Sequence, residues 1–228
     1  MKTYFDPPPA PTALFGAQLA RVVDVQDPDG YGRIQVKLYN FDGLQDQDAP
    51  IWARVAVPFA GGDRGAFFIP DVGDEIVVTF INGDPRQPIV VGGLWNGDKK
   101  PSETLSGPNV DRWTITGKQK TKISIIEDST GPKVELRTPA GRTLTLDDAQ
   151  STITASDPTG NSVTMDASGI TITAASKVTV NAATVEVTAG TVTVNSAMST
   201  FSGVVQCNTL IATTVVSSAY TPGAGNIW

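Results

Sequence analysis

Four short runs decide the fold of the C-terminal third of this chain: Ile170-Thr171-Ile172, Val178-Thr179-Val180, Val185-Glu186-Val187 and Val192-Thr193-Val194. Similar runs precede them, at Leu144-Thr145-Leu146, Ile153-Thr154 and Val163-Thr164-Met165, and small or polar residues interrupt the pattern every seven to ten residues. Apolar residues at every second position indicate half-buried strands rather than a helix. Repetition of such strands at a short spacing is typical of a β-solenoid or a stalk of stacked units.

A unit this small cannot cover its apolar face or its strand edges alone, so stacking or other copies of the chain must cover them. Charge is also scarce here, because after Gln150 the only basic residue is Lys177 and the only acids are Asp157, Asp166 and Glu186. Low charge can indicate disorder. Alternation of Thr, Ser and Asn with Val and Ile favours ordered β-structure instead, and we expect a stiff rod.

Composition excludes several classes of function. The net charge of −6 and the pI near 4.6 disfavour nucleic-acid binding, which needs a basic track. Seven aromatic residues of the barrel region are not interleaved with basic clusters and are expected to pack in a core; they are Tyr31, Tyr39, Phe41, Trp52, Phe67, Phe68 and Phe80. No run of 18 apolar residues predicts a membrane helix, and no apolar signal-peptide core follows Lys2. Synthesis in the cytoplasm without a signal peptide is therefore expected.

No residue is predicted to do covalent chemistry or to bind a metal or cofactor. The chain has no histidine, which removes Ser-His-Asp and Cys-His catalysis and His-ligated metals, and its single cysteine, Cys207, has no base to activate it. The acid pairs Glu127-Asp128 and Asp147-Asp148 lie beside turns without an aromatic subsite, so solvated turns are favoured over a glycosidase pair. Asp27-Pro28-Asp29-Gly30 lacks the further acids of a calcium loop and predicts a β-turn.

The region from Leu14 to about Asn96 predicts a small closed barrel. Short alternating segments separated by Gly, Pro and Asp turns are typical of antiparallel strands, and five or six of them in about 80 residues suit such a barrel. The expected strands are 18–25, 33–38, 52–57, 67–70, 75–81 and 89–95, with further strands at 122–126, 133–137 and 142–146. No helix of ten residues is expected anywhere in the chain.

Three stretches of the barrel region carry a resemblance to a known family. They are Val23–Val36 with the Asp27-Pro28-Asp29-Gly30 turn, Pro70–Phe80, and Asn82–Gly92; Leu136–Asp148 adds a match beyond the barrel. These stretches resemble the OB-fold domain, and the neck that follows it, of phage baseplate assembly protein V and the VgrG spikes of type VI secretion. The resemblance spans roughly residues 15 to 200.

The resemblance implies an all-β protein: an N-terminal OB-fold barrel followed by a C-terminal intertwined triple-stranded β-helix, assembled as a homotrimeric prism. Its implied divisions are a Pro-rich extension (1–13), the OB-fold barrel (14–98), a linker (99–112), the β-helix neck and shaft (113–219) and a C-terminal end (220–228). The residues expected to face the trimer axis are Ile170, Ile172, Val178, Val180, Val185, Val187, Val192 and Val194.

The implied function is that of a structural central spike in a contractile injection machine: a phage tail, a tailocin or a related system. Family members of this kind assemble into the baseplate and help pierce the target envelope. An iron-binding histidine tip is excluded here, so Asn226, Ile227 and Trp228 are expected to dock a separate PAAR-like tip protein. About 14 residues precede the barrel, so the baseplate hub is expected to be another protein.

Two alternatives remain open. A β-helical polysaccharide depolymerase would need an acidic cleft lined by aromatics, whereas the only aromatics after Trp113 are Phe201, Tyr220 and Trp228. An adhesin stalk would need an exposed receptor-binding surface and no hub partner.

Overall fold

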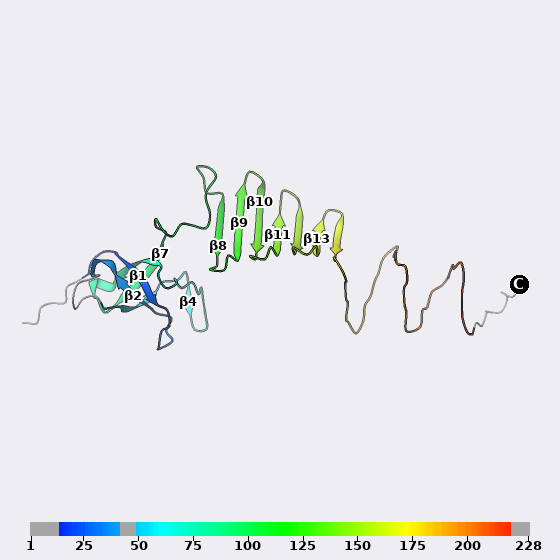
Figure 1. Cartoon of the computed structure of the whole chain (residues 1–228), viewed down its shortest axis with the longest axis horizontal. Helices are drawn as coiled ribbons and strands as arrows, with labels where there is room; N and C mark the ends of the chain where they lie inside the picture. Colours follow the sequence, from blue (N-terminus) through cyan, green and yellow to red (C-terminus); the bar gives the residue numbers. More distant parts are fainter. Residues whose placement is uncertain (1–13, 42–48, 220–228) are drawn as a thin grey trace, which may run out of the picture. The chain divides into compact units, whose positions relative to one another are not determined.

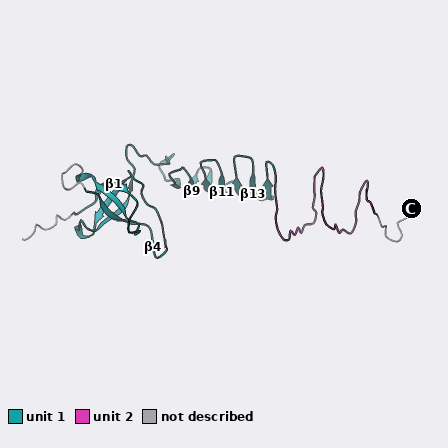
Figure 2. Cartoon of the chain, turned by 60° about the horizontal axis from the view of Figure 1, so that its bottom comes forward, with its two compact units in different colours: residues 1–177 teal, residues 178–228 magenta. Residues whose placement is uncertain are grey.

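The computed structural model describes residues 14–41 and 49–219. It divides into two units, residues 1–177 and 178–228, which Figure 2 shows in different colours. In the described ranges the only helical elements are two 3-10 turns, Tyr39–Phe41 and Ile81–Gly83, and all other regular structure is β. The prediction of an all-β chain is confirmed.

Five strands close into a barrel in the order β1-β2-β3-β7-β6. Their bounds are β1 (Gln18–Asp24), β2 (Ile34–Leu38), β3 (Ile51–Val55), β6 (Glu75–Phe80) and β7 (Pro88–Leu94). All pairs are antiparallel except β3 with β7, where Arg54 lies opposite Ile89 and Val55 opposite Val90. This parallel pair completes the ring, so no edge of the barrel sheet is left unpaired.

The barrel core follows directly from alternation along the strands. In β6 every second residue is buried, and β2 begins with the buried pair Ile34 and Val36. The buried core consists of Ala20, Val22, Ile34, Val36, Ala53, Ile76, Val78, Phe80 and Val90. Small and β-branched side chains dominate because the interior of a five-stranded barrel is narrow. The predicted OB-fold barrel is confirmed.

The segment after β3 differs from the sequence-based expectation. A two-stranded hairpin, β4 (Ala60–Gly61) with β5 (Arg64–Gly65), projects here, and no strand forms at 67–70. Consecutive Phe67 and Phe68 have no partner strand, and Pro70 has no N–H to donate. Phe67 is 84% exposed. The expected core packing is therefore correct for Phe80 but wrong for Tyr31, Tyr39, Phe67 and Phe68, which are exposed, while Phe41 and Trp52 are half-buried.

The predicted turn between β1 and β2 is confirmed, and Asp27 organises it. Its carboxylate accepts hydrogen bonds from the backbone N–H of Asp29, Tyr31 and Arg33, and from Arg33 Nε (3.1 Å) and Nη2 (2.7 Å). The Arg33 guanidinium holds the pKa of Asp27 well below its ordinary value. A carboxylate so completely satisfied acts as an internal staple of the loop.

Beyond the barrel, unit 1 contains a seven-stranded antiparallel sheet in which every strand pairs with its neighbour in sequence (Figure 1). Its strands are β8 (Arg112–Thr116), β9 (Lys122–Asp128), β10 (Gly131–Arg137), β11 (Thr143–Asp147), β12 (Thr152–Ser156), β13 (Ser162–Asp166) and β14 (Gly169–Thr173). All these pairings are made within one chain, so an intertwined β-helix remains a prediction only for residues after Thr173.

Unit 2 has no strand in its described residues, 178–219. Its backbone runs in straight segments separated by bends, of which those at 183, 190 and 197 are seven residues apart and others follow between 202 and 219; Figure 2 shows it as a zigzag trace. The Val/Thr alternation that predicted strands is present, yet no strand of residues 14–41 or 49–219 lies beside these segments. A strand needs a hydrogen-bonding neighbour, and one copy does not supply it here.

Candidate self-association surface

One face of the β8–β14 sheet carries two continuous apolar rows. Because strands pair in register, each apolar residue lies directly opposite another on the neighbouring strand. The first row is Trp113, Ile125, Val134, Leu146, Ile153, Met165 and Ile170, and the second is Ile115, Ile123, Leu136, Leu144, Ala155, Val163 and Ile172. Together these two rows form the surface that we call the apolar face.

The apolar face is the uncovered side of the sheet. Most of its side chains are exposed, from 39% at Leu144 to 68% at Ile170. The opposite face, with the row Thr114, Ser124, Glu135, Thr145, Thr154, Thr164 and Thr171, is mostly half-buried. An amphipathic sheet usually buries its apolar face and exposes its polar face, whereas in a single copy of this chain the apolar face is the more exposed one. A contiguous apolar surface of this kind marks an interaction site.

The face opposite the apolar face, which we call the hydroxyl face after its row of Thr and Ser side chains, is covered near β8 and β9 by the preceding segment of the chain. Ser102 Oγ lies 2.9 Å from Thr116 Oγ1, and Glu103 pairs with both Lys122 and Arg112. The bond from Lys122 keeps the pKa of Glu103 below its ordinary value. Arg112 also contacts Asp111 at 2.9 Å and Asp128 at 3.5 Å. Because this cover lies on the polar side, the apolar face stays free.

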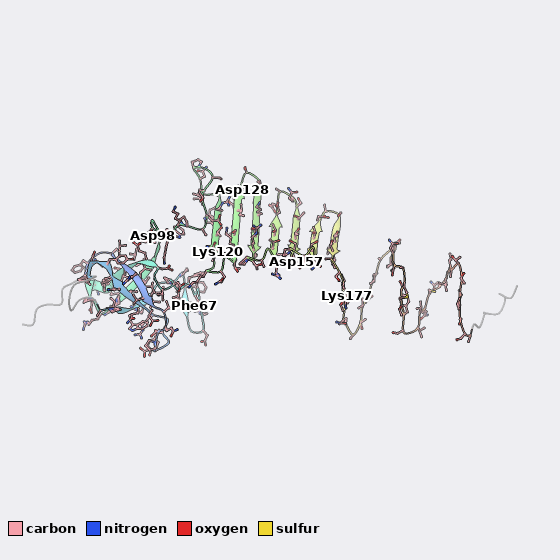
Figure 3. All side chains as sticks on the ribbon, viewed as in Figure 1. Phe67, Asp98, Lys120, Asp128, Asp157 and Lys177 are labelled. Carbon is pink, nitrogen blue, oxygen red and sulfur yellow. The ribbon has the colours of Figure 1, made fainter. Side chains whose placement is uncertain are left out.

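Carboxylates close the turns at both ends of the strands. Asp128 accepts the Thr130 N–H at 2.8 Å, and Asp157 accepts the Thr159 and Asn161 N–H groups at 2.8 and 3.1 Å. Figure 3 labels Asp128 and Asp157 at turns that lie at opposite ends of the strands. Side-chain bonds from Asn161 lower the pKa of Asp157. These are turn-forming roles, which accord with the predicted solvated turns rather than with acid catalysis.

Neither sequence-predicted acid pair is arranged as a reacting pair. Asp128 accepts the Thr130 N–H within its own turn, and Asp147 accepts the Gln150 N–H at 2.9 Å. Within the described ranges, no group of three or more His, Cys, Asp or Glu side chains could hold a metal ion. No helix in those ranges is long and apolar enough to cross a bilayer.

The residues predicted to face a trimer axis fall into two groups. Ile170 and Ile172 lie on the apolar face, opposite Met165 and Val163. The six valines from Val178 to Val194 lie in unit 2, and all of them are exposed. Their inward orientation in an assembly stays a prediction. The proposed tip residues Asn226, Ile227 and Trp228 lie outside the described residues.

The sequence-based prediction of the trimer core includes only Ile170 and Ile172 of the apolar face and misses its members on β8 to β13. The missed residues begin with Trp113 and Ile115 on β8 and Ile123 and Ile125 on β9. The same alternation was visible at Trp113-Thr114-Ile115 and Ile123-Ser124-Ile125. These residues lie well before the Val/Thr repeat that begins at Leu144, so the sequence alone did not indicate that they continue the same apolar rows.

A second exposed surface lies on the barrel. A groove runs between the β1–β2 loop and the β4–β5 hairpin, and its lining includes Tyr31, Val57, Arg64 and Phe67. Arg33 holds the loop side of this surface, with its guanidinium carbon 5.4 Å from the centre of the Tyr31 ring and 5.7 Å from that of Trp52. The Asp27 staple fixes Arg33 in turn, so Tyr31 is presented by a well-defined loop.

Comparison with known families matches both β regions. Residues 18–95 match the type VI secretion system/phage-baseplate injector OB domain. Residues 133–200 match the phage baseplate V C-terminal trimerisation domain. The first match coincides with the barrel from β1 to β7, and the second extends from β10 through β14 into unit 2.

Curated relatives carry the same kind of name. The type VI secretion system spike protein VgrG2a of Pseudomonas aeruginosa is 34% identical over 105 residues, which are 43% of this chain and 12% of that protein. The spike protein VgrG3 of Vibrio cholerae is 37% identical over 94 residues, 39% of this chain and 9% of the relative. The actin cross-linking toxin VgrG1 of Vibrio cholerae is 32% identical over 106 residues, 44% of this chain and 10% of the relative. This chain therefore spans about a tenth of the length of the curated relatives it matches.

Proposed function

Through its two matched domains this chain belongs to the phage baseplate V and VgrG spike family, and on that premise we propose that it is the structural central spike of a contractile injection machine. Three copies associate through the apolar faces of their β8–β14 sheets. The assembly transmits mechanical thrust, and its own residues catalyse no reaction.

The exposed apolar face carries this proposal. Two unbroken rows of aliphatic side chains, left in water by a single copy, gain free energy when other copies cover them. Three sheets around one axis can each turn this face inward and keep the hydroxyl face outside. The family description of residues 133–200 as a trimerisation domain supports the number three.

Stiffness follows from the same arrangement. Each sheet is held by a continuous antiparallel ladder from β8 to β14, and packing of three apolar faces would join the ladders into one body. Bending such a body requires many hydrogen bonds and apolar contacts to give way together. A rod of this kind suits the delivery of force to a target envelope.

The partners follow from the two ends of the chain. The barrel groove at Tyr31 and Phe67 is suited to a baseplate hub protein, because exposed aromatic side chains held by a rigid scaffold are typical of binding surfaces. At the other end, Asn226, Ile227 and Trp228 are the candidate seat of a PAAR-like tip protein. Assembly into the baseplate of a phage tail or an extracellular contractile particle accords with the VgrG names of the relatives.

Oligomeric mass and particle composition test the proposal. Light scattering on the purified chain should give about three times its mass of 23.9 kDa. Purified particles carrying an affinity tag on this chain should contain hub and sheath proteins, with the chain at the particle axis in negative-stain images. A stable folded monomer, absence from the particles, or clearing of a surface polysaccharide by the pure chain would refute the structural role.

A further inference from the structure

Residues 178–198 consist of three consecutive seven-residue units. They are Val-Thr-Val-Asn-Ala-Ala-Thr (178–184), Val-Glu-Val-Thr-Ala-Gly-Thr (185–191) and Val-Thr-Val-Asn-Ser-Ala-Met (192–198). The backbone bends at 176, 183, 190 and 197, once in every seven residues. Three equivalent straight legs result, at 177–182, 184–189 and 191–196.

The backbone of these legs is not paired within its own copy. Alternating residues up to Thr173 form a ladder in the single chain, whereas the equally alternating legs form none in the described residues. A meander that simply continued β14 would have paired here as β8–β14 do. Shaft N–H and C=O groups need partners, and other copies of the same chain can supply them.

Three-fold symmetry then determines which legs lie side by side. Suppose that each leg crosses one side of a triangular shaft and each bend turns a corner. The next leg of the same copy is then on the next side, and the strand beside the first leg comes from another copy, one unit further along its sequence. All legs run around the axis in the same sense, so neighbouring strands are parallel and offset by seven residues. Val178 therefore lies beside Val185 of a neighbouring copy, and Thr179 beside Glu186.

This register brings together the only two charges between Asp166 and the end of the described chain. Lys177 and Glu186 both alternate with the valines, so both project from the face opposite to them. Neither has an ion pair within its own copy, as far as the described residues show. Across the proposed register they are diagonal neighbours, with Cα atoms about 7–8 Å apart, which long side chains can bridge.

We propose that Lys177 of one copy pairs with Glu186 of the next, so that three symmetry-related salt bridges hold the shaft strands in the seven-residue offset. This inference rests on the proposed trimeric spike. The winding of three copies sets this offset, and one pair of opposite charges on each side of the shaft reinforces it.

Cysteine cross-linking tests the register itself. In a Cys207→Ser background that keeps Lys177 and Glu186, Asn181→Cys with Thr188→Cys places two thiols on adjacent strands about 4.8 Å apart, within the Cα range of a disulfide. Oxidation should join all three copies into a covalent trimer on a non-reducing gel. The matched control is Asn181→Cys with Asn195→Cys, whose positions are two strands, or about 9.6 Å, apart and should stay unlinked. A covalent trimer from the control but not from the first pair would overturn the seven-residue offset, as would disulfides formed only within single copies.

Charge exchange tests the salt bridge. Lys177→Glu and Glu186→Lys should each speed dissociation of the trimer about tenfold or more, because three attractive pairs become repulsive together. The double exchange should restore the rate to within about threefold, and 1 M salt should shrink the single-variant effects. A double variant as weak as either single variant would refute the pair. Failure of the unsubstituted chain to form trimers would instead refute the proposed function, so the two failures are distinguishable.

Discussion

Replacement of Ile172 by Ala should weaken assembly while leaving each copy folded. Ile172 ends the second apolar row on β14, where it lies opposite Val163 and is 64% exposed in the single chain. The neighbouring Thr171 projects from the other face, opposite Thr164. Thr171→Ala is therefore a matched control that changes the same strand on the side away from the proposed axis.

The expected magnitude follows from the exposed fraction. Full burial of an Ile side chain contributes about 1.5–3 kcal/mol, so the 64% that remains exposed leaves about 1–2 kcal/mol per copy for assembly. Over three copies the loss is about 3–6 kcal/mol, which raises the trimer dissociation constant roughly a hundredfold to ten-thousandfold. The cavity left in the assembled core acts in the same direction.

Sedimentation equilibrium over a wide concentration range measures this constant, and circular dichroism reports the fold of each copy. Ile172→Ala should shift the trimer–monomer midpoint to much higher concentration, and Thr171→Ala should leave it close to that of the unsubstituted chain. The reasoning is refuted if both variants shift the midpoint equally, or if Ile172→Ala assembles normally.

Three further changes probe other contacts. Asp27→Asn should lower the thermal stability of the barrel, because Arg33 Nη2 loses its 2.7 Å charged partner in the β1–β2 loop. Differential scanning calorimetry would detect this loss. An unchanged unfolding transition would contradict the stabilising role of the Asp27 hydrogen bonds. The pKa of Asp27 is held below its ordinary value of 3.8, so its stabilising contribution is complete above about pH 4 and declines as the pH falls toward the lowered pKa; acid titration of barrel unfolding should be flatter for Asp27→Asn than for the unsubstituted chain. Asn161→Ala removes the acceptor of the Ala175 N–H at 2.9 Å and should speed hydrogen exchange at Ala175 up to about tenfold, with Ile153 as an unaffected internal reference. Val178→Asp should reduce the yield of trimer by placing a charge at the predicted axis, and a normal yield would argue against inward packing of the shaft valines.

The elements that sequence predicted well are those whose pattern is local. The Asp27-Pro28-Asp29-Gly30 turn and the alternation in β2 and β6 depend on residues only a few positions apart. Strands β9 to β11 were predicted for the same reason. The parallel pairing of β3 with β7 joins Arg54 to Ile89, and no local pattern indicates such a distant partner.

The parts that could not be predicted depend on what lies beside a strand. Phe67 and Phe68 have the composition of a strand, but none of the described strands pairs with them and their side chains remain exposed to solvent. Val178-Thr179-Val180 and Ile170-Thr171-Ile172 look alike in sequence, yet only the second is paired within the chain. Alternation identifies a segment that can form a strand. Whether the neighbouring strand comes from the same copy or from another one depends on the fold and on the number of copies.

The uncovered apolar face has a consequence for biogenesis. A newly translated copy exposes the two apolar rows of β8–β14 until other copies bind to it. An exposed apolar surface of this kind promotes aggregation in the cell. Assembly competes with clearance by chaperones and proteases, so the yield of finished spikes should rise steeply with the local density of nascent chains. Synthesis of several copies from one polysome would favour assembly over clearance, because nascent copies would be close together as they leave their ribosomes.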